Sequence, residues 1–288
     1  MTRSGTGEPR ERQGVDAGPG RWNERALYRN ALATACPRPV AVGYPAVRRG
    51  PEPFCRRRAN DDREDLEDRF DARFEGPYER RYNMAPGQRL PVVTDAASDR
   101  IRSLEWGLEP DWDGDRLINA RAETVASKPS FRAAYEGVGR DGGVGESEGR
   151  EAGRCLVLAD GFYEWADGQP YRVAFEDDRP FAMAGLWRSP ETETTQAGLD
   201  AFGGGSDAEE PAEVGSFTVV TTEPNALVAD LHHRMAAVLE PDGERQWLSA
   251  EDPRGVLESY PADEMRAYPV STAVNGPDTD DPSLVEPI

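Results

Sequence analysis

Apolar residues occur along this chain mainly in short runs, and few of these runs have the length or the 3.6-residue period of a long helix. Residues 155–159 (Cys-Leu-Val-Leu-Ala) form one such run between Arg154 and Asp160, a pattern typical of a buried strand. Asp160-Gly161 and the aromatic run Phe-Tyr-Glu-Trp come next. Because Asp-Gly is a common hairpin turn, the pattern predicts that a second strand folds back on the first.

Further strands are predicted wherever β-branched and aromatic residues run between turn residues. They fall at residues 90–94, 101–112, 171–175, 181–187, 216–222 and 268–271. Helices are fewer and short, at residues 63–74, 128–132 and 225–231 and around Trp247. Because no unit of a strand and a long helix repeats, we predict an α+β fold that is mainly β. It would be a barrel-like mixed sheet of many short strands with short flanking helices.

The charge of the chain is strongly acidic, with 34 Lys and Arg against 54 Asp and Glu and a net charge of −20. Lys128 is the single lysine. A surface rich in carboxylates and poor in lysine is typical of a protein that stays hydrated in high salt, so we interpret the chain as a halophilic acidic protein. The same charge argues against non-specific binding of nucleic acid unless a local basic groove exists, because phosphates are repelled.

The cysteines Cys36, Cys55 and Cys155 form neither a disulfide framework nor a zinc-binding pattern. We therefore predict no metal and no cofactor, and a reducing cytoplasm as the compartment. The sequence has no apolar run of the ~20 residues needed to cross a bilayer and no signal-peptide pattern. The expectation is a soluble cytoplasmic monomer without a membrane partner.

Residues 1–54 differ from the rest of the chain. They hold nine Arg against five acidic residues, a charge of +4, which leaves −24 for the remainder. Rich in Gly, Pro and Arg and without a period, they are expected to be disordered or a spurious N-terminal extension. Residues 55–288 are expected to form a single domain with an acidic, low-complexity loop at 188–215.

Six motifs occur in order along the chain, and together they are far more specific than any one alone. They are Arg81-Tyr82-Asn83-Met84-Ala85-Pro86, Trp106-Gly107-Leu108, Asn119-Ala120-Arg121-Ala122-Glu123-Thr124, Ala159-Asp160-Gly161-Phe162-Tyr163-Glu164-Trp165, Ala184-Gly185-Leu186-Trp187 and His232-x-Arg234-Met235. The set resembles the SRAP family, the SOS response-associated peptidases or abasic-site processing proteins, from about Glu64 to the C-terminus.

The resemblance implies a DNA-damage-response protein that binds single-stranded DNA and joins covalently to an abasic site, with possible lyase and peptidase activity. The family's nucleophile is a cysteine that becomes the first residue once the initiator Met is removed. A terminal cysteine offers an α-amine, with a reference pKa of about 7.7–8.0, and a thiol on adjacent carbons. The amine forms an imine with the sugar aldehyde, and the sulfur closes a thiazolidine. An internal cysteine lacks that amine.

The resemblance also implies roles for single residues. Glu164 and His232 match the family's catalytic carboxylate and histidine, which would handle protons. Asn119 matches the residue that holds the terminal cysteine. Three arginines would grip phosphates and two further residues would offer apolar faces to bases. The arginines are Arg81, Arg121 and Arg234, and the apolar residues are Pro86 and Trp112.

Each assignment has a structural alternative. Glu164 lies between two aromatic residues and, on strand alternation, faces away from both, so it could point to water. Asn119 could cap the next helix, Arg121 and Glu123 could pair with neighbours, and His232 could be a surface residue. Trp106, Trp187 and Cys155 are expected in the core, with Cys155 an inert thiol.

The nucleophile is where the sequence departs from the family. The family begins Met-Cys-Gly-Arg, whereas here Cys55 follows Phe54, precedes Arg56 and has 54 residues upstream. Three interpretations remain open: a misassigned start or frameshift, cleavage before Cys55, or loss of the nucleophile. The shift in composition favours the first.

Three functions therefore remain in competition. The leading one is a crosslinker at abasic sites. The alternatives are a non-catalytic protein that binds single-stranded DNA, and a cysteine peptidase that uses Cys55 and His232.

Overall fold

The computed structural model describes residues 59–110, 114–137, 151–190 and 214–288. The chain divides into two units, Met1–Glu52 and Pro53–Ile288, and all described residues belong to the second. Cys55, Trp112 and most of the predicted acidic loop lie outside the described residues.

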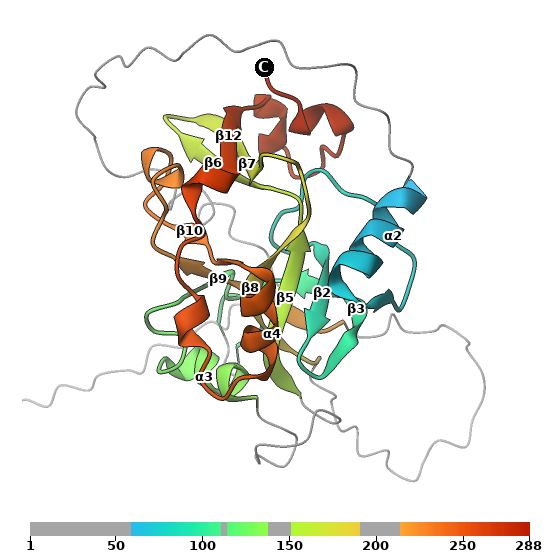
Figure 1. Cartoon of the computed structure of the whole chain (residues 1–288), viewed down its shortest axis with the longest axis vertical. Coiled ribbons are helices and arrows are strands. Elements are labelled where there is room, and N and C mark those ends of the chain that lie inside the picture. Colours follow the sequence, from blue (N-terminus) through green and yellow to red (C-terminus); the bar gives the residue numbers. More distant parts are fainter. Residues whose placement is uncertain (1–58, 111–113, 138–150, 191–213) are drawn as a thin grey trace, which may run out of the picture. The chain divides into compact units, whose positions relative to one another are not determined.

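A large mixed sheet forms the centre of the second unit (Figure 1). Its neighbour order is β1-β3-β2-β5-β8-β9-β10, with β4 paired to β9 and β11 to β8. Because β3 also pairs in parallel with β9, the strands β3, β2, β5, β8 and β9 close into a ring. The predicted barrel-like mixed sheet is thereby confirmed. The strands are β1 Arg73–Phe74, β2 Arg89–Thr94, β3 Ala97–Trp106, β4 Asn119–Arg121, β5 Ala152–Ala159, β8 Phe181–Arg188, β9 Ser216–Thr222, β10 Met235–Ala236 and β11 Val238–Leu239.

A second sheet of three strands has the order β12-β7-β6, from β6 Phe162–Ala166, β7 Gln169–Phe175 and β12 Met265–Pro269. The hairpin predicted at Asp160-Gly161 is wrong, because β5 pairs with β2 and β8, and β6 pairs with β7. The hairpin turn is instead Asp167-Gly168, whose φ angles of 50° and 82° suit the tight turns that join antiparallel strands. Asp160-Gly161 carries the chain from one sheet to the other.

Gly161 is needed at this crossing because a Cβ atom there would lie 2.7 Å from Nε of Arg172. Arg172 is buried and donates to the backbone oxygen of Asp160. The Asp160-Gly161 pair thus changes the chain direction without forming a hairpin. Glycine is required there because the Arg172 guanidinium lies close to the backbone.

Three α-helices occur in the described residues: α2 Ala59–Phe70, α3 Pro129–Glu136 and α4 Pro241–Ser249. None of these helices is long and apolar enough to span a membrane. The prediction that the first helix runs on to residue 74 is wrong, since the backbone turns at Asp71 with φ 48° and Phe74 pairs in β1. The segment predicted as a helix at 225–231 contains one 3-10 turn. The 3-10 turns are Val228–Asp230, Arg254–Val256, Ala262–Glu264, Thr272–Asn275 and Pro282–Val285.

The predicted strand at 101–112 is shorter than expected. It ends at Trp106 because Gly107, with φ 129°, redirects the backbone, and Leu108 then bridges to Leu117. The Trp106 indole donates to the Ile118 oxygen at 2.9 Å and packs partly buried against the core.

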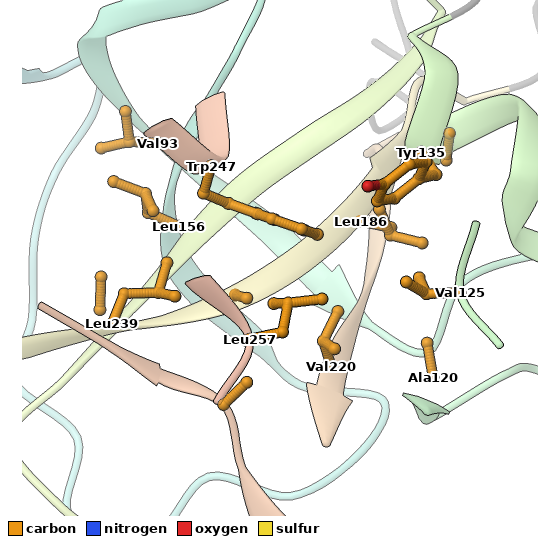
Figure 2. Close-up of a cluster of buried hydrophobic side chains, with 14 of the residues drawn as sticks. Val93, Ala120, Val125, Tyr135, Leu156, Leu186, Val220, Leu239, Trp247 and Leu257 are labelled. Atoms are coloured by element: carbon orange, nitrogen blue, oxygen red, sulfur yellow. The ribbon is translucent and has the colours of Figure 1, made fainter. Parts of the chain in front are cut away.

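Apolar side chains cover both faces of the ring strands. On β5, Leu156 and Leu158 join one cluster, and Cys155 and Val157 join the other. In the first cluster Trp247 of α4 extends between side chains of the sheet (Figure 2). Its indole Nε1 lies 3.0 Å from the oxygen of Cys155 and 3.3 Å from that of Gly185, so the helix is fixed directly over a paired position of β5 and β8.

A chain of ion pairs joins α2 to both sheets. Arg80 donates to Asp62 of α2 at 2.8 Å and to Asp160 at 2.6 Å. Asp160 also pairs with Arg172 of β7 (3.2 Å), which continues to Asp178 (3.1 Å). This network fixes the segment that leads directly into β6.

Candidate functional site

Glu164 lies in the middle of β6, opposite Tyr171 of β7. Its two aromatic neighbours are held on the other face of the strand. The Tyr163 hydroxyl donates to the oxygen of Tyr82 at 2.7 Å, and the Trp165 indole donates to Asn275 at 2.8 Å. Strand alternation therefore turns Glu164 away from both aromatic residues, as the sequence predicted.

His232 follows a compact turn that Asn225 organises. The Asn225 side-chain oxygen accepts hydrogen bonds from the backbone amides of Leu227 and Val228, and its amide donates to Tyr260 at 2.7 Å. The 3-10 turn that follows ends with the amide of His232 donating to the Val228 oxygen at 2.8 Å. The buried Asn225 thus fixes the turn that positions His232.

The structure brings together Glu164 of the three-stranded sheet and His232 of the segment that precedes β10. His232 Nδ1 lies 3.4 Å from Oε2 of Glu164 and 3.0 Å from the backbone oxygen of Arg234. The Glu164 side chain is only 18% exposed, and this burial raises its pKa to about 8. Because a buried carboxyl without a charged base beside it favours its neutral form, Glu164 can hold a proton near neutral pH. The alternative in which Glu164 points to water is wrong.

Asn119 and Arg121 lie on the same exposed face of β4, with Ala120 buried between them on the other face. β4 runs parallel to β9, with Asn119 opposite Val219 and Arg121 opposite Thr221. Asn119 therefore does not cap a helix. Among the described residues no ion pair or hydrogen bond engages the Arg121 side chain, so its charge remains available to an anion.

Arg234 is held firmly beside this face. Its Nη1 and Nη2 lie 2.6 Å and 3.1 Å from the two carboxylate oxygens of Glu123, and Nη2 lies 2.5 Å from the oxygen of Thr221. This ion pair lowers the pKa of Glu123. The structural alternative of pairing with neighbours holds for Glu123 and, among the described residues, not for Arg121.

His233 interacts with His232 and with the charges of Arg121 and Arg234. Its ring packs against that of His232 with centroids 4.4 Å apart. Partial desolvation, followed by the charges of His232, Arg234 and Arg121, lowers the pKa of His233. Contacts thus link Glu164 to the two histidines and to Arg234, and the charge of Arg121 acts on His233.

Arg81 and Pro86 lie on a separate loop. Arg81 pairs with Asp280 at 2.5 Å, and among the described residues no hydrogen bond or ion pair joins it to Glu164 or His232. Pro86 and Gly87 are the central residues of a tight turn, closed by the amide of Gln88 and the oxygen of Ala85 at 3.0 Å. Gly87 is the third residue of this turn, and its φ of 87° lies in the left-handed region that favours glycine.

Of the two cysteines Cys55 and Cys155, only Cys155 lies within the described residues. Cys55, like Trp112, lies outside the described residues, so its distance from Glu164 and His232 is not defined. Cys155 is fully buried, and burial raises the pKa of its thiol well above the usual value. Burial and a raised pKa both disfavour the reactive thiolate, in line with the interpretation of Cys155 as an inert thiol.

Several residues that build the site escaped sequence reasoning. Asn225, Asp160 and Asp280 position their surroundings through contacts with residues far along the chain. Only Asn225 carries a local signal, since an asparagine before a short helical segment commonly caps it. The partners of the two aspartates depend on tertiary structure.

Comparison with known proteins supports a family assignment. A family model described as SOS response associated peptidase (SRAP) matches residues 54–142 and 146–277. The chain is 35% identical over 231 residues to abasic site processing protein YoqW of Bacillus subtilis, which covers 74% of this chain and 88% of that protein. It is 30% identical over 243 residues to abasic site processing protein HMCES of Gallus gallus, which covers 74% of this chain and 68% of that protein.

Solved structures show the same fold. A protein from Bacteroides thetaiotaomicron is 26% identical with a TM-score of 0.52, over 70% of this chain and 82% of that one. A protein from Bordetella bronchiseptica, 23% identical with a TM-score of 0.53, covers 73% of this chain and 96% of its own and supports the fold alone.

Proposed function

The chain belongs to the SRAP family, and from this premise we propose that it processes abasic sites by forming a covalent thiazolidine crosslink with single-stranded DNA. The family members YoqW and HMCES are named abasic site processing proteins. The observation that carries the proposal is the contact at 3.4 Å between the buried carboxyl Glu164 and the imidazole of His232.

The chemistry needs one group that gives a proton and one that accepts it. The α-amine of Cys55 attacks the aldehyde carbon of the opened sugar and forms a carbinolamine. A proton supplied to the hydroxyl lets it leave as water and gives an iminium ion, which returns a proton from its nitrogen to form the imine. The thiol then adds to the imine carbon, forming the C–S bond, while its proton passes to the nitrogen. Glu164, whose pKa is raised to about 8, suits the first transfer, and His232 suits the second.

The DNA contact would lie beside this pair. Arg121 is exposed and its charge is not engaged among the described residues, so we assign it the main phosphate contact. Arg81 and Arg234 already pair with Asp280 and Glu123, and a phosphate would have to share them. We assign Asn119, which shares the exposed face of β4 with Arg121, the role of holding the terminal cysteine. Pro86 and Trp112 remain proposed base contacts.

The N-terminus is a separate requirement. The α-amine of Cys55 exists only if residues 1–54 are never made or are removed. The family model begins its match at residue 54, which supports a functional start at Cys55. A chain that begins Met-Cys55 should therefore be the active form.

The decisive experiment incubates the protein with single-stranded DNA that carries one abasic site and looks for a heat-stable shifted band. We expect the chain that begins Met-Cys55 to crosslink and the full chain to do so only when intact mass shows processing. Cys55→Ala should abolish the band, and Cys155→Ala, which removes a buried thiol, is the matched control that should keep it.

Two results would contradict the proposal. If an unprocessed full chain crosslinks, the α-amine of Cys55 is not the nucleophile. If binding occurs and is sensitive to salt but no band resists heating, the protein is a non-catalytic single-stranded DNA-binding protein.

A further inference from the structure

The environment of His232 defines which ring nitrogen carries the proton. Nδ1 lies 3.0 Å from the backbone oxygen of Arg234, and a carbonyl oxygen can only accept a hydrogen bond. Nδ1 must therefore carry the hydrogen, which the Glu164 carboxyl at 3.4 Å can share. In the neutral ring, the lone pair is then on Nε2, which has no hydrogen-bond partner among the described residues.

The backbone carbonyl of Arg234, which selects this tautomer, is held in place through the Arg234 side chain. The Arg234 guanidinium is bound at three points, by both carboxylate oxygens of Glu123 and by the Thr221 oxygen of β9. Its side chain is only 17% exposed. Met235 immediately follows and pairs with Thr222 in β10, so the backbone at Arg234 is fixed from both its side chain and its C-terminal neighbour.

We propose that Glu123 is a positioning residue for His232: by anchoring Arg234, it holds the carbonyl that keeps His232 in the Nδ1–H tautomer and leaves Nε2 as the proton acceptor. The role rests on the proposed function only in its consequence for rate, since the tautomer itself is a property of the free protein. Glu123 touches no reacting group in this arrangement. It acts through Arg234 alone.

This interpretation separates the two arginines of the site. Arg121 offers an unengaged guanidinium to DNA, whereas the charge of Arg234 is neutralised by a bidentate partner. Removing the Glu123 carboxylate should therefore free a cation and should not weaken DNA binding. A loss of crosslinking rate without a loss of affinity would distinguish positioning from DNA binding.

The tautomer can be measured directly because the chain has only two histidines. Labelling histidine with 15N and recording long-range proton–nitrogen correlations on the full chain gives two ring patterns, and His233→Gln assigns them. With the imidazole ring neutral, the wild-type protein should show the Nδ1–H pattern for His232. Glu123→Gln should show a mixture of the two tautomers.

Glu136→Gln is the matched control, because Glu136 is 48% exposed like Glu123 and also pairs with one arginine, on the surface of α3. It should leave the pattern unchanged. Glu123→Asp keeps the charge on a shorter side chain and should give an intermediate pattern, and it decides the question if Glu123→Gln does not fold.

The second measurement is the crosslinking rate at saturating abasic-site DNA. We expect Glu123→Gln to slow it roughly tenfold with affinity for undamaged DNA unchanged or higher, Glu123→Asp to recover part of the rate, and Glu136→Gln to match the wild type. An unchanged tautomer in both Glu123 variants would overturn the proposal. If the wild type never crosslinks but Glu123→Gln still shifts the tautomer, the proposed function fails and the positioning role stands.

Discussion

Replacing Glu164 with glutamine should stabilise the protein at alkaline pH and impair its chemistry. The two side chains have nearly the same shape, so the substitution mainly removes an ionisable group. In the folded protein burial raises the pKa of Glu164 to about 8 from its ordinary value of 4.5. At 1.36 kcal/mol per pKa unit, this difference corresponds to roughly 5 kcal/mol in favour of the neutral carboxyl.

The sign follows from proton binding. Between pH 4.5 and about 8 the unfolded chain has lost the Glu164 proton and the folded chain retains it. Stability of the wild type therefore falls with rising pH in this window, and the loss is complete above the folded-state pKa. Glutamine has no such dependence. The variant should match the wild type near pH 4.5 and exceed it by about 2–5 kcal/mol at pH 9, where 5 is the upper limit because the side chain is partly exposed.

The assay is urea unfolding at pH 5, 7 and 9 at constant salt, with both proteins measured in parallel. His232 is the titratable group that faces Glu164, at 3.4 Å, so the series is repeated in a His232→Gln background to remove their coupling. Glu244→Gln is the contrasting control. Glu244 is also buried, but Arg69 binds both its oxygens, so losing its charge should destabilise the protein at every pH.

A stability difference between Glu164→Gln and wild type that does not change with pH would refute the reasoning, because it would mean that Glu164 ionises in the folded protein as in the unfolded chain. Crosslinking is measured on the same samples. The variant should slow the reaction more than it weakens DNA binding. Greater stability together with lower activity is what a buried carboxyl retained for chemistry should show.

Three further predictions concern DNA binding and the fold. Arg121→Ala should weaken binding of single-stranded DNA before it affects the rate of crosslinking, and should reduce the slope of log affinity against log salt by about 0.7. Gly185→Ala should cost about 1–3 kcal/mol in unfolding free energy because its Cβ would lie 2.8 Å from Sγ of Cys155, whereas Gly255→Ala, with no atom within 4 Å, should be neutral. Asn83→Ala should cost about 1–3 kcal/mol and expose the C-terminal segment to proteolysis, since the amide donates to three carbonyls between residues 274 and 279.

The strands were predictable because their patterns are local. The run at 155–159 and the β-branched run at 216–222 became β5 and β9 within a few residues. Which strands pair was not predictable from the turn alone. Asp160-Gly161 has the composition of a hairpin, but the Arg80 and Arg172 guanidiniums bind Asp160, and β5 instead finds its partners in β2 and β8.

The site residues likewise divide into features that a local pattern identifies and contacts that depend on tertiary structure. Glu164 and His232 were identified by motifs, and their proximity depends on two sheets that the sequence does not order. The sequence left open whether Arg121 and Glu123 pair with neighbours and named no partner for either, and the structure pairs Glu123 with Arg234. The short strand β4, which pairs with β9, holds Arg121 on its exposed face, so Glu123 is the residue of this motif that forms the ion pair.

Under the proposed function, the placement of Glu164 and His232 would make the packing between the sheets a functional element. Glu164 belongs to the three-stranded sheet and His232 lies three residues before Met235 of β10, so their contact joins the small sheet to the segment that enters the larger one. Phe175 of β7 packs edge-on against Phe181 of β8 at a centroid distance of 5.3 Å, and the ion pairs of Asp160 fix the crossing strand from the other direction. A polar contact at 3.4 Å tolerates little displacement. Rigid attachment of the small sheet to the ring therefore keeps the carboxyl and the imidazole in contact, and loosening it should separate the pair before it unfolds either sheet.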